Sequence, residues 1–439
     1  MRRMWCASSS STDMTIGEFH HRTNCRLCGS SDLPLVLELT PTPPANAFVG
    51  EAEVETAQRC FPLDVYFCEQ CAHVQLLDVV DPRILFENYV YVSGTSPVFV
   101  RHFEDYAQRL IERFALVDGD LVCDIGSNDG VFLRAFRDRG ARVLGVDPAI
   151  DIAERATQSG IPTRAEFFTP ALARELRRDE GAAKLVTANN VFAHADDLAG
   201  IVEGVRTLLD DDGVFVFEVS YLLDVYEKTL FDTIYHEHVA YHSVLPLQTF
   251  FAEHGMSLFD VERVGSHGGS LRGMAGPAGV HEVSPRVDRS IAEERAAGLH
   301  TAATFVRWAE QIRARGQALT AVLNEQQRRG RRIAGFGAPA KATTLMYHYG
   351  LSRDVFQFIV DDSPLKQGLY SPGLHVPVLP FTELASRDID CVVILAWNFA
   401  DSIIEKCSSF LAQGGTVVVP LPEVRVIEHE DEAIAREAS

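Results

Sequence analysis

The segment IYHEH, residues 234–238, places a phenol, two imidazoles and a carboxylate in consecutive positions. Histidine changes its protonation near neutral pH, and a neighbouring carboxylate can hold it in one tautomer. A tyrosine hydroxyl can donate a hydrogen bond to an oxygen on which negative charge develops. Surface loops also collect His and Glu, but such a cluster is suited to moving protons. The pattern indicates an enzyme, with Tyr235, Glu237 and His238 as candidate catalytic residues.

Four of the nine cysteines form two Cys-x-x-Cys pairs, Cys25 with Cys28 and Cys68 with Cys71. Four thiolates can close a tetrahedral shell around zinc and leave no position open for water, as in a structural site. Redox-active cysteine pairs would have the same spacing. The presence of two pairs favours a structural zinc site, and the segment between them must form a small subdomain that returns to the metal.

A strand, a glycine turn and a helix are predicted for residues 121–140, LVCDIGSNDGVFLRAFRDRG. The next strand ends at Asp147, which is placed to accept hydrogen bonds from the two hydroxyls of an adenosine ribose. Further strands are predicted at 185–190 and 213–220. This alternation of strands and helices predicts an α/β fold with a doubly wound parallel sheet that binds its ligand at the carboxyl ends of the strands.

The glycine turn distinguishes between nucleotide cofactors. A dinucleotide site normally reads Gly-x-Gly-x-x-Gly, whereas DIGSNDG has a single early glycine with acidic residues beside it. Acidic residues disfavour phosphate and suit a cationic sulfonium, although a turn without any ligand would need the same glycines. The strand-DIGxxxG-helix pattern resembles motif I of the class I S-adenosylmethionine (SAM) methyltransferases. The resulting candidate cofactor contacts are Gly126, Asn128, Asp129, Asp147, Asn189 and Asn190.

The composition narrows the class of protein. The 439 residues suffice for two or three domains, and 46% hydrophobic with 23% charged residues is typical of a globular chain. A net charge of −21 without a basic stripe makes nucleic acid an improbable substrate. No apolar run is long enough to span a bilayer, and the first residues lack the apolar core of a signal peptide. We therefore expect a cytoplasmic protein with a small-molecule substrate and no membrane partner.

The last third of the chain repeats the alternation of strands and helices. RRIAGFGAPAKATT is predicted as a strand, a glycine turn and a helix, which resembles a second nucleotide-binding fold. Gly335-x-Gly337 could hold NAD and make the protein an oxidoreductase, because Ala340 is tolerated in place of the third glycine. Lys341 and the helix N-terminus would equally well bind a nucleotide diphosphate, and this is the role we predict for them.

Two segments connect the predicted sheet domains. GSHGGSLRG, residues 265–273, could meet phosphate oxygens through His267 and Arg272, although a plain turn between strands is nearly as consistent with its glycines. Residues 286–329, rich in Ala, Glu and Arg, are predicted to be a helical linker. The predicted order is a disordered extension (1–21), a zinc-binding subdomain (22–84), a cofactor-binding domain (85–285), the helical linker (286–329) and a C-terminal α/β substrate-binding domain (330–439).

An ordered set of motifs extends over roughly residues 22–425: the cysteine pairs, ENYVYVSGTSP, CDIGSNDG, NNVFAH, FDTIYHEHVAYHS, GSHGGSLR and GFGAPAKATT. The set resembles the sugar C-methyltransferases that act on TDP-linked 4-keto-6-deoxyhexoses in antibiotic deoxysugar pathways. The resemblance implies a monomeric or loosely associated enzyme of three domains that uses SAM and a structural zinc. It implies an active site containing Tyr89, His194, Tyr235, Glu237 and His238.

Two features depart from the pattern of that family. Ala195-Asp196 follows His194, and His242 stands where an aromatic residue was expected. Neither is expected to touch the chemistry, although His242 leaves the lining of the pocket open. Tyr89 is as often a packing residue in such a segment as a catalytic one.

The chemistry can be argued from the acidity of a carbon beside a ketone. Its proton leaves at a useful rate only if a base takes it while hydrogen-bond donors stabilise the enolate oxygen. We expect His238 to be the base and Glu237 or another carboxylate to hold its imidazole. Tyr235 and His194 would bond the C4 oxygen or fix the sugar. The acceptor carbon is expected to be C3, the commonest choice in the family that the chain resembles. The acidity of the chain disfavours an RNA-modifying enzyme, and the presence of both IYHEH and DIGSNDG disfavours a catalytically silent scaffold.

Overall fold

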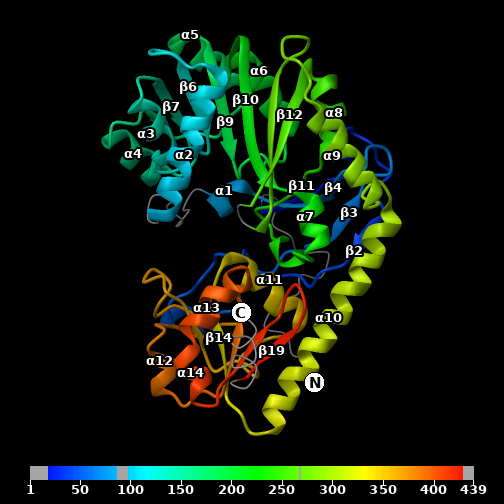
Figure 1. The fold of residues 1–439 in the computed structure, drawn as a ribbon, viewed down its shortest axis with the longest axis vertical. Coiled ribbons are helices and arrows are strands. Elements are labelled where there is room, and N and C mark those ends of the chain that lie inside the picture. Colours follow the sequence, from blue (N-terminus) through cyan, green and yellow to red (C-terminus); the bar gives the residue numbers. More distant parts are fainter. Residues whose placement is uncertain (1–17, 87–96, 266–267, 429–439) are drawn as a thin grey trace, which may run out of the picture.

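The computed structural model describes residues 18–86, 97–265 and 268–428. The central sheet lies above the C-terminal sheet, and helix α10 (Ala302–Arg328) runs along the side of the C-terminal domain (Figure 1). None of the described helices combines the length and the apolar character needed to cross a membrane.

Within the described residues, the central sheet has seven strands in the order β12-β13-β10-β9-β6-β7-β8. Strands β6 to β10 run parallel, and β13 and β12 complete the sheet as antiparallel strands. The strands are β6 (Leu121–Ile125), β7 (Arg142–Val146), β8 (Thr163–Arg164), β9 (Ala183–Asn189), β10 (Leu209–Ser220), β12 (Met256–Val264) and β13 (Ser270–Pro277). The prediction of an α/β domain with a doubly wound sheet is confirmed.

The central strands are apolar because helices cover both faces of the sheet. All five residues of β6 are buried, as expected for a parallel strand between two helical layers. Local signals fix the helix ends, for example the side chain of Thr169, which accepts a hydrogen bond from the backbone N–H of Leu172 at the start of α5. The helices are α2 (Pro97–Phe114), α3 (Val131–Arg137), α4 (Ile150–Gln158), α5 (Pro170–Glu180), α6 (Leu198–Leu208), α7 (Leu222–Glu227) and α8 (Val244–Glu253).

A smaller antiparallel sheet, in the order β11-β4-β3-β2, carries the cysteine pairs. Its strands are β2 (Leu35–Leu37), β3 (Val65–Phe67), β4 (Val74–Leu76) and β11 (Ala240–Tyr241). Strand β11 directly follows the IYHEH segment, so a piece of the central domain completes the N-terminal sheet. Strand β1 (Phe19–His21) pairs with β5 (Asp78–Val80), which corrects the end of the predicted extension, since residues 19–21 are ordered as a strand. Short helical turns lie at Glu51–Glu53 and in α1 (Pro82–Phe86).

The C-terminal sheet has the order β16-β15-β14-β17-β18-β19 in the described residues and is parallel except for β19. Its strands are β14 (Ile333–Phe336), β15 (Ile359–Val360), β16 (Val378–Leu379), β17 (Cys391–Ile394), β18 (Thr416–Val419) and β19 (Arg425–Ile427). Its helices are α11 (Ala340–Tyr349), α12 (Glu383–Ser386), α13 (Ala400–Lys406) and α14 (Ser408–Ala412). Helix α9 (Pro285–Ala296) precedes α10 in the segment that was predicted to be helical. The predicted second Rossmann-like fold is therefore present.

Candidate functional site

The four predicted metal ligands lie together. Their sulfur atoms are all within 4.8 Å of one another. The Sγ atoms of Cys25 and Cys71 are 3.6 Å apart, and those of Cys28 and Cys68 are 3.5 Å apart. A tetrahedral zinc with Zn–S bonds of about 2.3 Å requires sulfurs about 3.8 Å apart, so the donor set fits zinc. All four are free thiols, and the prediction of a four-cysteine zinc site is confirmed.

The glycine turn after β6 is shaped for close approach. Gly126 has a φ of +71°, and a Cβ there would lie 2.3 Å from a methyl carbon of Val191, so only glycine fits. Asn128 also adopts a left-handed conformation, with a φ of +50°. Asp129 follows at the start of α3, where its Oδ1 accepts from the N–H of Val131 at 3.4 Å. The turn thereby presents backbone at the carboxyl end of β6, as the sequence predicts.

Asp147 holds this turn in place. Its Oδ2 accepts a hydrogen bond from the N–H of Asn128 at 2.8 Å, and its Oδ1 accepts one from the N–H of Ala149 at 2.9 Å. The side chain is buried at the end of β7. Each carboxylate oxygen has a second lone pair, so the two can also accept from ribose hydroxyls.

The neighbouring strand β9 supplies buried polar atoms without partners. Both amide atoms of Asn189 and the Oγ of Ser127 are buried and have no hydrogen-bond partner among the described residues. Asn190 has a φ of +55°, and its N–H donates to the carbonyl of Glu218 at 2.7 Å. Buried polar groups are normally satisfied, so orphaned atoms at the carboxyl ends of adjacent strands mark a place for a polar ligand. The residues therefore fit the polar parts of SAM.

Replacing Asp147 by Ala should weaken SAM binding roughly 10-fold to 100-fold, because hydrogen bonds to a charged group contribute about 1.5 to 3 kcal/mol each. Calorimetric titration with SAM measures the effect. Asp151→Ala is the control, since Asp151 is exposed in the first turn of α4 and should leave SAM binding unchanged. An equal loss in both variants would contradict the role of Asp147.

The candidate base has a defined tautomer. The Nδ1–H of His238 donates to the carbonyl of Thr233 at 2.8 Å, so the neutral ring carries its lone pair on Nε2. The ring of His238 stacks on the ring of His194, with the two centroids 5.0 Å apart. The centroid of the Tyr235 ring lies 4.2 Å from that of His238. Three of the predicted catalytic residues are thus brought together.

Glu237 lies elsewhere in this loop. It is buried, and its Oε1 accepts from the side-chain amide of Asn46 at 3.0 Å. The Nδ1–H of His238 donates to the backbone carbonyl of Thr233, whereas Glu237 or another carboxylate was expected to hold the imidazole. Glu237 therefore ties the loop to the N-terminal region.

Backbone hydrogen bonds fix the loop at the edge where the cofactor site lies. The carbonyl of Ala193, four residues after the orphaned Asn189, accepts from the N–H groups of Val239 at 3.0 Å and Ala240 at 3.1 Å. The N–H of Leu76 in β4 donates to the carbonyl of Val239 at 3.0 Å. The IYHEH loop is therefore held between the segment after β9 and the zinc-binding sheet, close to the carboxyl edge of the central sheet.

The C-terminal domain contacts the same loop through a buried polar cluster. The Nε1–H of Trp397 donates to Asp232 Oδ2 at 2.6 Å, and the Nζ of Lys341 lies 4.0 Å from that oxygen. The Lys341 ammonium is 3.7 Å from the centre of the Trp397 ring. Burial lowers the pKa of Lys341, and the carboxylate of Asp232 opposes this shift. Lys341 thus lies beside Asp232, two residues before the IYHEH segment.

Two predicted phosphate contacts do not lie with Lys341. The guanidinium of Arg272 is buried, donates to Glu218 Oε2 at 2.7 Å and is 3.5 Å from the centre of the Tyr106 ring. Its charge is already compensated inside the central domain, which corrects the prediction that it meets phosphate oxygens. His267, like Tyr89, lies outside the described residues. The sequence did not decide whether His242 lines the substrate pocket. Its ring is fully buried.

The glycine turn of the C-terminal domain is closed. Asp361 accepts from the N–H groups of Ala338 at 2.7 Å and Ser363 at 2.8 Å, as Asp147 does in the central domain. Phe48 from the N-terminal region helps to line a cavity of about 10 Å³ beside this turn. Ligand pockets usually measure about 300 to 1,000 Å³, so this cavity does not suit NAD. The oxidoreductase alternative gains no support here.

The sequence analysis missed several residues of this region. Thr233 acts through its backbone carbonyl, for which no side-chain signal exists. Asp232 and Trp397 meet across 165 positions of sequence, so a single sequence cannot pair them. Arg26 lies between two cysteine ligands and is buried, and a buried charge there could have been suspected only after the fold was known.

Comparison with known proteins agrees with the geometry. Three family models match: "Putative zinc binding domain" at residues 25–86, a methyltransferase domain at 99–260, and the C-methyltransferase C-terminal domain at 265–422. The C-methyltransferase NovU of Streptomyces niveus is 37% identical over 410 residues, which cover 92% of this chain and 97% of that protein.

Solved structures resemble the chain only over part of its length. Magnesium protoporphyrin IX methyltransferase (ChlM) from Synechocystis PCC 6803 with bound SAH is 16% identical, with a TM-score of 0.32, covering 42% of this chain and 88% of that one. The PH0226 protein from Pyrococcus horikoshii OT3 is 16% identical, with a TM-score of 0.35, covering 45% and 98%. By its whole-length relative and its three matching domains, the chain belongs to the family of SAM-dependent C-methyltransferases that carry an N-terminal zinc-binding domain.

Proposed function

We propose that the enzyme methylates the carbon next to the ketone of a TDP-linked 4-keto-6-deoxy sugar, with C3 as the acceptor carbon. The observation that carries this proposal is the stacked pair His194 and His238, whose ring centroids are 5.0 Å apart. His194 follows strand β9, and His238 belongs to the loop whose Ile234 carbonyl accepts a hydrogen bond from Thr344 of the C-terminal domain. A C-methyltransferase needs a base if a proton must leave its acceptor carbon before the methyl group is transferred. The histidine pair can supply that base, which favours an acceptor carbon made acidic by a neighbouring ketone.

His238 takes the proton from the acceptor carbon. Because its Nδ1–H is engaged by the carbonyl of Thr233, the proton moves to Nε2. Proton removal leaves an enolate whose charge lies mainly on the C4 oxygen of the sugar. The bond to Thr233 keeps the ring oriented through this step and stabilises the imidazolium that forms.

His194 remains neutral beside this charge. Burial lowers the pKa of His194 well below its ordinary value, and the neighbouring His238 lowers it further. Two rings stacked this closely cannot both hold a proton at low cost, so charging His238 keeps His194 neutral. The Nε2 of His194 is buried without a partner among the described residues and is available to the sugar. Together with the hydroxyl of Tyr235, it is the proposed contact to the C4 oxygen.

SAM, when bound, supplies an electrophilic methyl group on a cationic sulfur. The turn at Gly126 and the side chain of Asp147 would hold it with its methyl group towards the enolate carbon, so that the new C–C bond would replace the C–S bond, whose electron pair would stay on the sulfur of a neutral thioether. His238 then returns its proton to solvent, which balances the reaction.

Lys341 is the proposed contact to the diphosphate of the sugar nucleotide. Its Nζ has no hydrogen-bond acceptor among the described residues, although it is mostly enclosed. An ammonium group has three donors, so phosphate oxygens can complete its shell. The C-terminal domain would then bind the nucleotide while its contact through Asp232 holds the catalytic loop.

A panel of TDP-4-keto-6-deoxy sugars incubated with SAM tests the proposal by mass spectrometry. A ketosugar is expected to gain one CH₂ in mass, with the new methyl group on carbon in the NMR spectrum of the product. The control is the same sugar reduced to the 4-alcohol, which has no acidic carbon and should not react. Methylation of the alcohol, or methyl transfer to oxygen, would contradict the proposed chemistry.

A further inference from the structure

The zinc site is joined to the active-site loops by a buried arginine. Arg26 lies between Cys25 and Cys28, and its side chain is 0% exposed. Its Nη1 donates to Gln75 Oε1 at 3.1 Å and also to the carbonyl of Leu76. Both acceptors belong to β4, the strand that pairs with β11 directly after the IYHEH loop.

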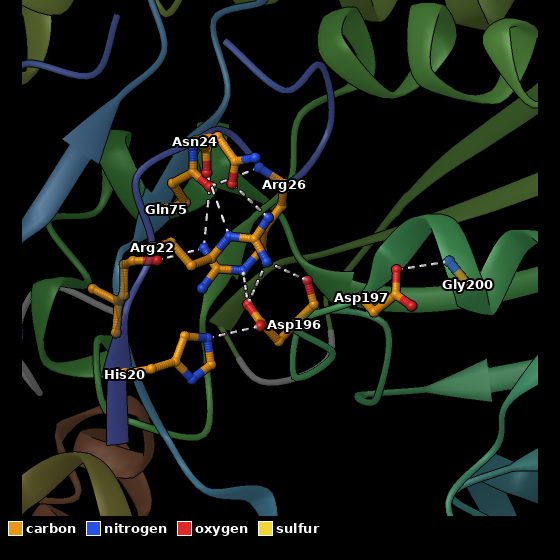
Figure 2. Close-up of polar contacts among 9 residues, drawn as sticks. His20, Arg22, Asn24, Arg26, Gln75, Asp196, Asp197 and Gly200 are labelled. Carbon is orange, nitrogen blue, oxygen red and sulfur yellow. Dashed lines mark hydrogen bonds and ion pairs between the residues drawn. The ribbon is translucent and has the colours of Figure 1, made fainter. Parts of the chain in front are cut away.

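The same guanidinium reaches the segment that carries His194. The Nε of Arg26 donates to Asp196 Oδ1 at 3.1 Å, two residues beyond His194 (Figure 2). Asp196 also accepts from Arg22 Nη1 at 2.9 Å and from His20 Nε2 at 3.2 Å. Figure 2 shows these donors converging on Asp196 from one side. The carboxylate therefore ties the His194 segment to the zinc-binding region.

The two connections act on the two rings of the catalytic pair. Through β4, the guanidinium is linked to β11 and so to His238. Through Asp196, it is linked to His194. A buried guanidinium that loses one partner leaves an uncompensated charge, so the contact strongly prefers a single geometry. The guanidinium of Arg26 would then set the distance between the rings of His194 and His238. Arg26 is itself anchored in the chain between the zinc ligands Cys25 and Cys28.

We propose that Arg26 and Asp196 are positioning residues through which the zinc site sets the spacing of His194 and His238. The inference rests on the proposed roles of those two histidines. The zinc then orders the active site as well as the fold of the N-terminal region.

Asp196→Ala tests the proposal without removing the buried arginine. Its kcat should fall by roughly 100-fold, because a displacement of about 1 Å at a catalytic group can cost that much. Zinc content, SAM affinity and KM for the sugar should stay as in the unmodified enzyme. Asp196→Asn keeps an oxygen acceptor for Arg26 and should restore most of the kcat.

Asp197→Ala is the matched control. Asp197 is the adjacent, exposed carboxylate and caps α6 by accepting from the N–H of Gly200 at 2.9 Å. Its loss should lower the melting temperature and leave kcat unchanged, because in Figure 2 its side chain points to Gly200 of α6, away from Arg26. A variant that is less stable but fully active separates stability from positioning.

The ¹⁵N chemical shifts of the His194 and His238 rings provide a readout that needs no substrate. Asp196→Ala should move both sets of signals, and Asp197→Ala should move neither. Unchanged ring signals, an unchanged kcat, or a loss of zinc in Asp196→Ala would each overturn the proposal. If no ketosugar is methylated by the unmodified enzyme, the proposed function fails, and the ring signals still decide whether Asp196 positions the pair.

Discussion

Replacing His238 by Asn is expected to abolish solvent deuterium exchange at the acidic carbon of the ketosugar and to lower methyl transfer by roughly 1,000-fold, within the range of general base catalysis. The physical reason is that Asn has no basic nitrogen to take the proton that we propose Nε2 of His238 accepts. SAM binding should survive, since the proposed cofactor contacts lie at the carboxyl ends of β6, β7 and β9. NMR of the sugar in D₂O and calorimetry with SAM measure the two effects separately.

His236 offers a matched control in the same loop. Its ring is buried, and its Nε2–H donates to the carbonyl of Phe61 at 3.2 Å, on the side of the N-terminal region. His236→Gln keeps a donor for that carbonyl and should retain deuterium exchange, at some cost in stability. Exchange that persists in His238→Asn, or that disappears equally in His236→Gln, would remove the assignment of the base.

Local patterns in the sequence predict those parts of the site that local structure determines. Two cysteine pairs must converge if they bind one metal, and they do. The DIGxxxG turn requires left-handed backbone, and Gly126 and Gly130 supply it at φ values of +71° and +74°. Asp147 could be placed because a carboxylate about twenty residues beyond such a turn follows from the length of one helix and one strand.

The remaining features depend on contacts between distant segments, which a single sequence does not reveal. The partner of His238 Nδ1 is a backbone carbonyl, and any residue at position 233 could offer one. The positive charge of Arg272 is typical of a phosphate contact. In the fold, however, Arg272 forms an ion pair with Glu218, which lies opposite it on the adjacent strand β10. Glu237 was expected to orient the imidazole of His238 because it is an adjacent carboxylate. In the fold it accepts a hydrogen bond from the side-chain amide of Asn46.

The IYHEH loop is joined by hydrogen bonds to all three parts of the chain. Strand β11 joins it to the zinc-binding sheet, and the carbonyl of Ala193 joins it to the central domain. The hydroxyl of Thr344 in α11 donates to the carbonyl of Ile234 at 2.7 Å, which joins it to the C-terminal domain. If His238 is the base, its geometry depends on the folding of all three domains, so distant changes in stability should reach the chemistry.

Loss of the zinc site is the second change for which a large effect is expected. Cys71→Ser, Cys25→Ser or exhaustive chelation should unfold the N-terminal region rather than lower turnover selectively. Binding of structural zinc contributes about 10 to 16 kcal/mol in zinc-finger peptides, more than the whole stability of most domains. Metal analysis should find one zinc per chain in the unmodified protein. Thermal unfolding with and without chelator measures the loss.

Cys407→Ala is the control for removal of a buried thiol. Cys407 is a free, fully buried cysteine in the C-terminal domain, between α13 and α14. Its replacement leaves a small cavity and should lower the melting temperature slightly without releasing zinc. Because β11 is part of the zinc-binding sheet, a protein without zinc should also lose the ring stacking of His194 and His238. A metal-free protein that keeps its melting temperature and its deuterium exchange would show that the four thiolates hold neither the fold nor the catalytic loop.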